Sequence, residues 1–170
     1  KIAVEIAGPD WIQVRGVETI QGDPFSRPVV TQQIVEQIGS SEGVYGAEGV
    51  IQGFPRISFE ETLIKPLGGA PTLAFNFDEE RAELTGFETI EGKAPSNGEA
   101  MVDIDTAQKY GISVGDNISI RSLQPEEQFT VSGITRWGQD NGGGAVFVLV
   151  DTPTAQRLFN YPDSYLAVTV

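Results

Sequence analysis

The sequence contains neither cysteine nor histidine. Without these residues the chain cannot form a disulfide, a Ser-His-Asp or Cys-His nucleophile system, a thiolate or imidazole zinc site, or an ordinary haem ligand set. The reactive groups that remain are carboxylates, hydroxyls and four lysines. These absences remove most of the common enzyme classes before any pattern is considered.

Positive charge and long apolar runs are also scarce. Against 24 Asp and Glu there are 11 Lys and Arg, so the formal net charge is −13 at pH 7. Such a field repels phosphate backbones, and nucleic acid is therefore not an expected partner. The longest wholly apolar run is Ala145–Val150, far below the roughly 20 residues of a bilayer-spanning helix. With 39% apolar residues in 170, the chain can still bury a core.

Alternating apolar residues and turn signals predict a chain rich in strands. Residues 2–20 form two extended stretches around the turn Gly8-Pro9-Asp10, and glycine-interrupted strands follow over 40–59. Further strands are expected over 72–78, 99–104, 117–123, 129–137 and 145–151. The segment 117–123 should pair with 129–137 across the Gln124–Glu127 loop.

Three helices are predicted. In the first, Ser26 is placed to cap, Pro28 lies in the first turn, and apolar residues recur every four positions up to Gly39. The other two belong to an internal echo, VDIDTAQKYG (102–111) and LVDTPTAQRLFN (149–160). Each copy reads as a strand, an acidic cap and a short helix with an alanine face, with helices over 106–110, capped by Asp105, and over 153–159, capped by Asp151.

The acid pair with the best spacing for chemistry is Asp103 with Asp105. Residues two apart in a strand share a face, so these carboxylates could converge on a sugar or a divalent ion. Capping of the following helix by Asp105 explains the pattern better, because the glycine and distal Glu of a calcium loop are missing. A carboxylate-dependent hydrolase stays an alternative function, as does a free-standing β-rich ligand-binding or adhesion module. No catalytic residue, cofactor site or metal site is assigned.

Contact with a substrate or partner is expected at aromatic residues beside turns and at a glycine-rich loop. The candidates are Phe54, Trp137, Gly142, Gly143 and Gly144. The three consecutive glycines lack the Lys-Ser or Lys-Thr of a phosphate-binding loop, so a loop over 138–144 is the prediction.

Several turn and strand motifs follow one another in a specific order. They are Gly92-Lys93-Ala94-Pro95, Gly98-Glu99, Gly111-Ile112-Ser113-Val114-Gly115-Asp116 and Val131-Ser132-Gly133-Ile134. In this order and spacing they resemble the large extracytoplasmic domain, or MacB-like periplasmic core domain, of FtsX-like or MacB-like ABC transporter permeases. The N-terminal segments 12–16 and 40–53 resemble the first half of the porter-like subdomain of the same family.

The resemblance implies an α+β fold with two subdomains. Residues 1–82 and 161–170, from both ends of the chain, would form a porter-like βαβ-type subdomain, and residues 83–160 an inserted β-rich subdomain with two short helices. The terminal segment 165–170 would return to the porter-like subdomain.

The resemblance also implies a noncatalytic role on the extracytoplasmic face of the bacterial cell membrane, within an integral membrane protein. The domain would couple ATP-driven motion to export of a substrate or to an extracytoplasmic partner. Its partners would be transmembrane helices of the same parent polypeptide, a separate cytoplasmic ATP-binding subunit, a second permease in a dimer, and a substrate that the sequence does not identify.

Overall fold

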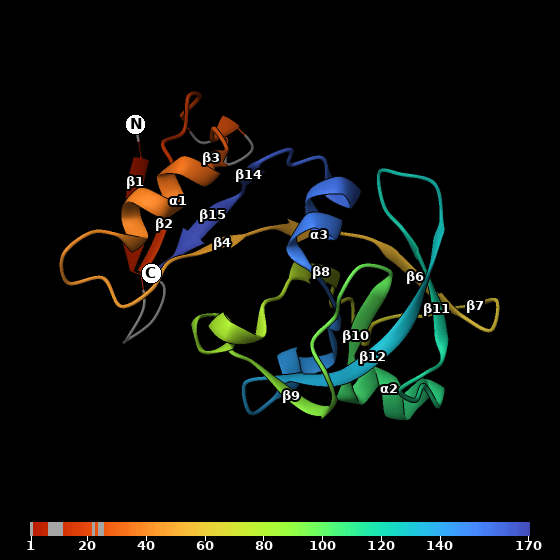
Figure 1. Ribbon diagram of the computed structural model, residues 1–170. Coiled ribbons are helices and arrows are strands. Elements are labelled where there is room, and N and C mark those ends of the chain that lie inside the picture. The colour runs from red at the N-terminus through yellow and green to blue at the C-terminus, as the bar shows by residue number, and fades with distance from the viewer. Residues whose placement is uncertain (1, 7–11, 22, 24–25) are drawn as a thin grey trace.

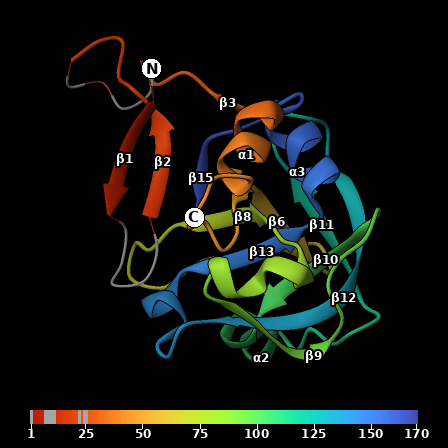
Figure 2. The same ribbon diagram turned by 60° about the vertical axis from the view of Figure 1, so that its left-hand side comes forward.

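The computed structural model of the protein describes residues 2–6, 12–21, 23 and 26–170, and its strands form two main sheets (Figure 1). The first sheet pairs four strands antiparallel in the order β1 (Ile2–Ile6), β2 (Ile12–Gly16), β15 (Ala167–Thr169) and β4 (Glu48–Val50). A short pair joins β3 (Val30–Thr31) to β14 (Ser164–Tyr165). β1 and β2 lie at one side of the molecule, away from the second sheet (Figure 2).

The second sheet is larger and mixed. Its order is β5 (Gln52–Gly53), β8 (Thr72–Asn76), β13 (Val146–Val150), β10 (Glu99–Asp103), β12 (Glu127–Trp137), β11 (Asn117–Arg121), β6 (Arg56–Phe59) and β7 (Thr62–Leu63), and β9 (Phe87–Gly92) also pairs with β12. β8 runs parallel to β13 and β10 runs parallel to β12, whereas the other pairs are antiparallel.

Three α-helices and two short 3₁₀ segments complete the described fold. The helices are α1 (Gln32–Gly39), α2 (Ile104–Tyr110) and α3 (Thr152–Phe159), and the 3₁₀ segments are η2 (Glu79–Leu84) and η3 (Asn141–Gly144). α3 lies above the strands of the second sheet and α2 below them in Figure 1. None of these described helices is long and apolar enough to cross a bilayer. The predicted α+β class is confirmed.

The first sheet contains a split βαβ unit. β2 and β4 are both antiparallel to β15, so they run parallel to each other, and α1 connects them over the same stretch of chain. Val14 and Val168 are register partners and lie buried on one face of this sheet. Gln13 and Thr169 are also register partners and occupy the opposite face, because neighbouring residues of a strand alternate.

β13 is an interior strand of the second sheet. All five of its residues are buried, with Val146, Val148 and Val150 in the main core and Phe147 and Leu149 in a smaller cluster on the other face. A strand covered on both faces is apolar at every position instead of at alternate ones. The continuous apolar run in the sequence therefore correctly predicted an interior strand.

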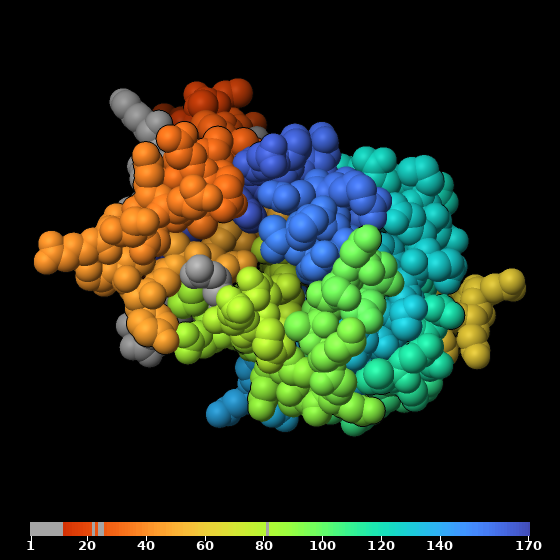
Figure 3. Space-filling view, in the orientation of Figure 1, coloured from red at the N-terminus to blue at the C-terminus, as the bar shows by residue number. Residues whose placement is uncertain are grey.

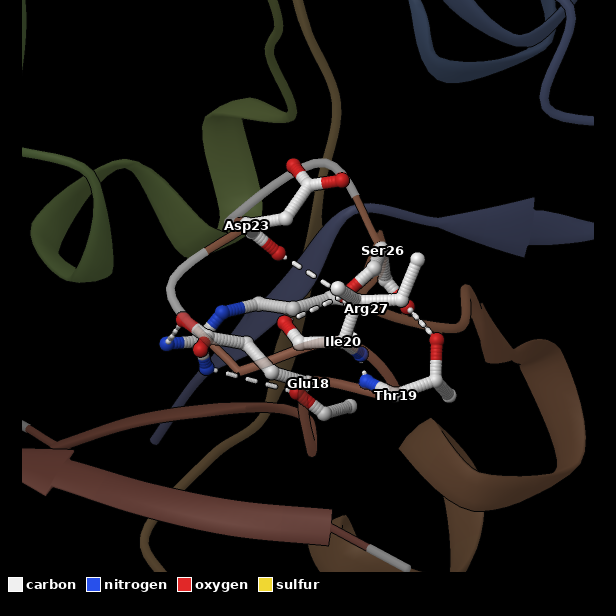
Figure 4. A network of polar contacts seen from close by, with 7 residues as sticks. Glu18, Thr19, Ile20, Asp23, Ser26 and Arg27 are labelled. Atoms are coloured by element: carbon white, nitrogen blue, oxygen red, sulfur yellow. Dashed lines mark hydrogen bonds and ion pairs between the residues drawn. The ribbon is translucent and has the colours of Figure 1, made fainter.

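The first predicted helix starts later than expected. α1 begins at Gln32, and Pro28 lies outside it. The prediction that Ser26 caps this helix is wrong, because its hydroxyl oxygen accepts hydrogen bonds from the backbone N–H groups of Thr19 (3.1 Å) and Ile20 (3.0 Å) (Figure 4). The loop before the helix thus uses the side chain that the sequence pattern assigned to the helix.

The two copies of the internal echo form the predicted strand-to-helix units, with one change of role. The side chain of Asp103, not that of Asp105, caps α2 by accepting a hydrogen bond from the Thr106 N–H at 2.9 Å. The prediction for Asp105 is wrong because β10 ends at Asp103, one residue earlier than expected, and α2 begins at Ile104, so Asp105 lies inside the helix. Asp151 occupies the N-cap position of α3 as predicted, but the predicted capping by its side chain is wrong, because that side chain makes no capping hydrogen bond.

Strand pairing changes from the first sheet to the second near Ile51. β5 to β8, which lie within residues 1–82, pair in the second sheet, where Ile57 of β6 is the register partner of Ile120 in β11. Hydrogen bonding therefore groups these strands with those of residues 83–160. The division into subdomains at 82/83 and 160/161 stays a prediction. The predicted return of the last strand is confirmed, because β15 lies between β2 and β4.

The ordered motifs of the sequence are turns that hold backbones close together. Gly92 has a φ of +76°, and a Cβ there would overlap the carbonyl oxygen of Ser132. A Cβ at Gly133 would lie 2.7 Å from the carbonyl oxygen of Lys93. Both positions therefore require glycine at the place where β9 pairs with β12. Glu99 closes the turn that connects β9 to β10, because its carboxylate accepts hydrogen bonds from Lys93 and from Ser96.

Candidate functional site

A pocket of about 310 Å³ lies between the first sheet and the second. This volume is at the lower end of the range of about 300 to 1,000 Å³ that is typical of small-molecule sites. Its walls come from both sheets and from the segments around η2 and η3. The lining residues are Gln13, Glu48, Gly49, Val50, Pro71, Leu73, Phe75, Asn76, Leu84, Thr85, Phe87, Trp137, Gly142, Ala145, Phe147 and Thr169.

Four aromatic rings form the wall on the side of the second sheet. They come from β8 (Phe75), β9 (Phe87), β12 (Trp137) and β13 (Phe147). The ring of Phe147 lies 5.6 Å from that of Phe87 and 5.7 Å from that of Trp137, and Phe75 lies 5.6 Å from Phe87, measured between centroids. These tilted and edge-on contacts are favourable arrangements for aromatic pairs. The strands thus present a continuous aromatic surface, which we call the aromatic wall.

The opposite side of the pocket is a polar row on the first sheet. Thr169 of β15 is the register partner of Gln13 in β2 and of Glu48 in β4. Residues directly opposite one another on neighbouring strands share a face. The three side chains therefore form one row across the sheet, and among the described residues that line the pocket Glu48 is the ionisable one.

Asn76 fixes the two sheets relative to each other at the edge of the pocket. Its side chain is buried; Oδ1 accepts a hydrogen bond from the Ile51 N–H at 2.7 Å, and Nδ2 donates to the Gly49 carbonyl at 2.8 Å. Nδ2 also donates to the hydroxyl of Thr152 at 3.2 Å. One amide side chain of β8 thus holds the segment where the chain passes from β4 to β5 and the first residue of α3.

Acidic side chains surround the outer part of the cleft. Two hollows that adjoin the pocket share Glu48 and Leu84 with it and are also lined by Glu36, Asp78, Glu80 and Glu83. A hydrogen bond with the Glu83 carboxylate, followed by its charge, raises the pKa of Tyr45 above its ordinary value. The surface is hollowed between the orange N-terminal segment, the blue of α3 and the yellow-green of η2 (Figure 3). Several of the described carboxylates thus lie beside the entrance to the pocket.

Of the five residues predicted to contact a substrate or partner, two line the pocket and three lie outside its lining. Trp137 and Gly142 line the pocket, and Trp137 is 43% exposed. Phe54 is 71% exposed and does not line it. Gly143 and Gly144 are also outside the lining, since Gly143 faces open space and Gly144 packs against Leu67. Their contact with a substrate or partner stays a prediction.

The carboxylate pair considered for chemistry is a structural element. Asp103 is 0% exposed, and its carboxylate accepts hydrogen bonds from Thr106 N (2.9 Å), Asn141 Nδ2 (3.0 Å) and Phe147 N (2.9 Å). Asp105 accepts one further bond from Asn141 Nδ2 at 3.1 Å. A fully buried carboxylate whose oxygens already bind three N–H donors has the geometry of a structural junction. Within the described ranges, no group of three or more carboxylates could hold a metal ion.

Most of the pocket has no local signal in the sequence. Phe75, Phe87, Phe147 and Glu48 come from separate strands, and each fits the ordinary pattern of a core aromatic or a surface acid. The available signal was the alternation in 72–77, which places Leu73, Phe75 and Phe77 on one face of a strand. Nothing in the local pattern indicates that the first sheet leaves part of this face uncovered.

No protein-family model matches the sequence, and no curated protein matches it. Solved structures do resemble the fold. The periplasmic region of MacB from Actinobacillus actinomycetemcomitans aligns with a TM-score of 0.70 and 9% identity over 96% of this chain and 74% of its own. The extracellular domain of the noncanonic ABC-type transporter YknZ from Gram-positive bacteria aligns with a TM-score of 0.66 and 12% identity over 95% of this chain and 82% of its own. The chain therefore has the fold of a MacB-like periplasmic domain, and the resemblance is confirmed for the fold.

Proposed function

We propose that the protein is the extracytoplasmic domain of an ABC transporter permease and has no catalytic activity of its own. The observation that carries this proposal is the likeness to two such domains over 95% or more of the chain. The ordered turn motifs of residues 92–134 support it independently, since they depend on the amino-acid sequence alone. Transmembrane helices of the same polypeptide, a cytoplasmic ATP-binding subunit and a second permease would complete the assembly.

The topology suits a domain that transmits motion. β1 and β15 both lie in the first sheet, so segments that precede Ile2 and follow Thr169 would act on this sheet first. The chain enters the second sheet after Ile51 and returns after Asn160, so two covalent connections join the sheets. Asn76 adds hydrogen bonds beside the first of them. A tilt of the first sheet would consequently be passed to the second and would change the width of the pocket between them.

The test is the location of the domain in the full-length protein. Because the chain contains no cysteine, a single Glu126→Cys variant places one thiol on an exposed loop. We expect a membrane-impermeant maleimide to label this thiol in intact spheroplasts as fully as in lysed ones. The full-length protein without the added cysteine is the control. Labelling only after lysis, or recovery of the protein outside the membrane fraction, would refute the proposal.

The pocket also suits a free-standing ligand-binding module, which was the second function left open by the sequence. Both functions would use the same walls, but only a permease domain is attached to membrane helices. The same fractionation therefore separates them: a module would be recovered without permease segments, whereas the proposed domain would remain in the membrane with them.

A further inference from the structure

We propose that Asn97 is a site of spontaneous covalent modification, at which the side-chain amide is converted to aspartate or isoaspartate through a cyclic succinimide. Asn97 precedes Gly98 in the turn 96–99, within the connection between β9 and β10 (Figure 1). The same dipeptide recurs at Asn141-Gly142, where the fold protects it. The inference concerns the chemistry of the 170-residue chain itself and does not depend on the proposed function.

The reaction needs only the chain and water. The backbone nitrogen of Gly98 attacks Cγ of Asn97, a C–N bond forms, and the side-chain nitrogen leaves as ammonia with the amide proton of Gly98. Water then opens the succinimide ring by cleaving one of its two C–N bonds. Cleavage of the bond to Cγ gives aspartate, and cleavage of the bond to the main-chain carbonyl carbon gives isoaspartate. Neither step transfers electrons, so no oxidant or reductant takes part.

The turn leaves both reacting groups accessible. Asn97 and Gly98 are exposed, and a Cβ built on Gly98 would have no heavy atom within 4 Å beyond its two neighbours in the chain. Gly98 also has no side chain to shield its nitrogen. Within the described part of the chain, no hydrogen bond engages the Asn97 side chain or the Gly98 N–H. Solvent and the attacking nitrogen therefore both have access to the Asn97 amide.

Two backbone hydrogen bonds oppose ring closure, which requires rotation about the Asn97 Cα–C bond. The Glu99 N–H donates to the Ser96 carbonyl at 2.9 Å, and the Thr130 N–H donates to the Gly98 carbonyl at 3.0 Å. Both bonds lie in an exposed turn, where local opening costs much less free energy than global unfolding. The reaction at Asn97 is therefore slower in the folded protein than in the unfolded chain, but it proceeds.

The second Asn-Gly pair is protected by burial and by hydrogen bonds. Asn141 is 4% exposed, and its Nδ2 donates to Asp103 Oδ1 at 3.0 Å and to Asp105 Oδ2 at 3.1 Å. Its Oδ1 accepts a hydrogen bond from the Trp137 N–H at 3.1 Å. Attack on Cγ would break these bonds and leave the buried Asp103 carboxylate without one of its donors. Asn141 consequently reacts only when this junction opens.

The products change the turn chemically. Each adds one negative charge two residues before Glu99, whose carboxylate accepts the Ser96 N–H at 3.0 Å. Isoaspartate also carries the main chain through the former side chain, which inserts one methylene group into the backbone. The extra atom displaces the Glu99 N–H from the Ser96 carbonyl. Aged molecules would thus differ from new ones at the connection between β9 and β10.

Peptide mapping tests the proposal because trypsin separates the two sites. Cleavage after lysine and arginine releases residues 94–109 and 137–157, each of which contains a single asparagine. The folded chain is incubated at mildly alkaline pH, and replacement of NH₂ by OH is followed by mass spectrometry, with enzymatic methylation to detect isoaspartate. We expect Asn97 to convert at least about tenfold faster than Asn141, which corresponds to a barrier difference of about 1.4 kcal/mol or more.

Two controls separate the effect of the fold from that of the sequence. In guanidinium chloride both pairs lose their protection, and the two rates should agree within about threefold because glycine follows each asparagine. Asn97→Gln retains an amide but would need a larger ring, so conversion in 94–109 should disappear while that in 137–157 stays the same.

Three results would overturn the proposal. The first is an unchanged Asn97 in the folded chain after the unfolded chain has reacted. The second is conversion of Asn141 as fast as Asn97 in the folded protein, or an equally large difference between the two in guanidinium chloride, since either removes the protective role of the fold. The third is undiminished conversion of 94–109 in Asn97→Gln, which would place the reaction at another residue.

Discussion

Replacement of Asp103 by asparagine should destabilise the fold far more than the same change at Asp105. The carboxylate of Asp103 is fully buried, and three N–H donors point at its two oxygens. Asparagine has nearly the same shape but only one acceptor oxygen, and its NH₂ group must replace the other. In one orientation the NH₂ faces the Phe147 N–H, and in the other it faces the donors of Thr106 and Asn141.

The magnitude follows from these contacts. Either orientation leaves at least one buried N–H without an acceptor, which costs about 1 to 3 kcal/mol, and the remaining bonds lose the strength that a charged acceptor gives. We therefore expect Asp103→Asn to lower the free energy of unfolding by about 2 to 4 kcal/mol. Asp105 is exposed and accepts one bond, so Asp105→Asn should cost about 0.5 kcal/mol or less.

Urea unfolding followed by far-ultraviolet circular dichroism measures this difference. With a slope of about 2 kcal/mol per molar urea, the midpoint of Asp103→Asn should fall by about 1 to 2 M while the slope stays the same. The Asp105→Asn midpoint should stay within about 0.3 M of the parent protein. If the two variants unfold within experimental error of each other, the structural role derived for Asp103 is refuted and the pair regains interest as a chemical site.

Three further predictions concern other junctions of the fold. Gly53→Ala should destabilise the protein by about 1 to 3 kcal/mol in urea unfolding, since the added methyl would overlap the ring of Phe159. Asn76→Asp should cost about 2 to 3 kcal/mol at pH 7, because it removes the donor to Gly49 and places a carboxylate against that carbonyl. Hydrogen bonds from Ser96, and secondly from Lys93, lower the pKa of Glu99 from 4.5 to about 2. The stability that this carboxylate contributes is therefore complete above pH 4.5 and is lost as the pH falls toward 2. A titration of the carboxyl group followed by NMR should show the low pKa.

Each of these has a matched comparison. Gly39→Ala adds a methyl 3.5 Å from Ala47, an ordinary contact, and should change stability by less than about 1 kcal/mol. Asn76→Asp should recover part of its loss when the pH is lowered enough to protonate the new carboxyl. Ser96→Ala should raise the pKa of Glu99 toward its ordinary value. An unchanged pKa in Ser96→Ala would show that the hydroxyl is not the main cause of the shift.

Local chemistry explains which elements the sequence predicted well. The alternation in 117–123 and 129–137 predicted the antiparallel pair β11 and β12, and the continuous apolar run in 145–151 predicted the doubly buried β13. The Thr-Ala-Gln echo predicted two short helices that bury Ala107 and Ala155. These features depend on neighbouring residues, whose periodicity is visible in one dimension.

The two wrong predictions of helix caps concern side chains or positions for which more than one hydrogen-bonding arrangement is chemically possible. Ser26 has the side chain of a helix cap, yet the backbone of Thr19 and Ile20 lies closer in the fold and takes its hydroxyl. Asp103 and Asp105 can each cap α2, and the choice depends on Asn141 and Phe147, about 40 residues further along the chain. Contacts at such separations leave no periodic signal in a single sequence.

By itself, the sequence determined the class of chemistry that is possible, the strand-rich composition and the turns at Gly92, Gly98, Gly111 and Gly115, because those depend on residue types and on local backbone conformation. Its ordered motifs also indicated the fold that the comparison of structures confirmed. Only the tertiary structure decided that Phe75, Phe87, Trp137 and Phe147 meet in one wall and that Gln13, Thr169 and Glu48 face it. The reason is physical. Side chains alternate between the two faces of their own strand, and this alternation is visible in the sequence. Which strand lies on the opposite side of the pocket is set by the packing of the two sheets, which the chain connects at only two places.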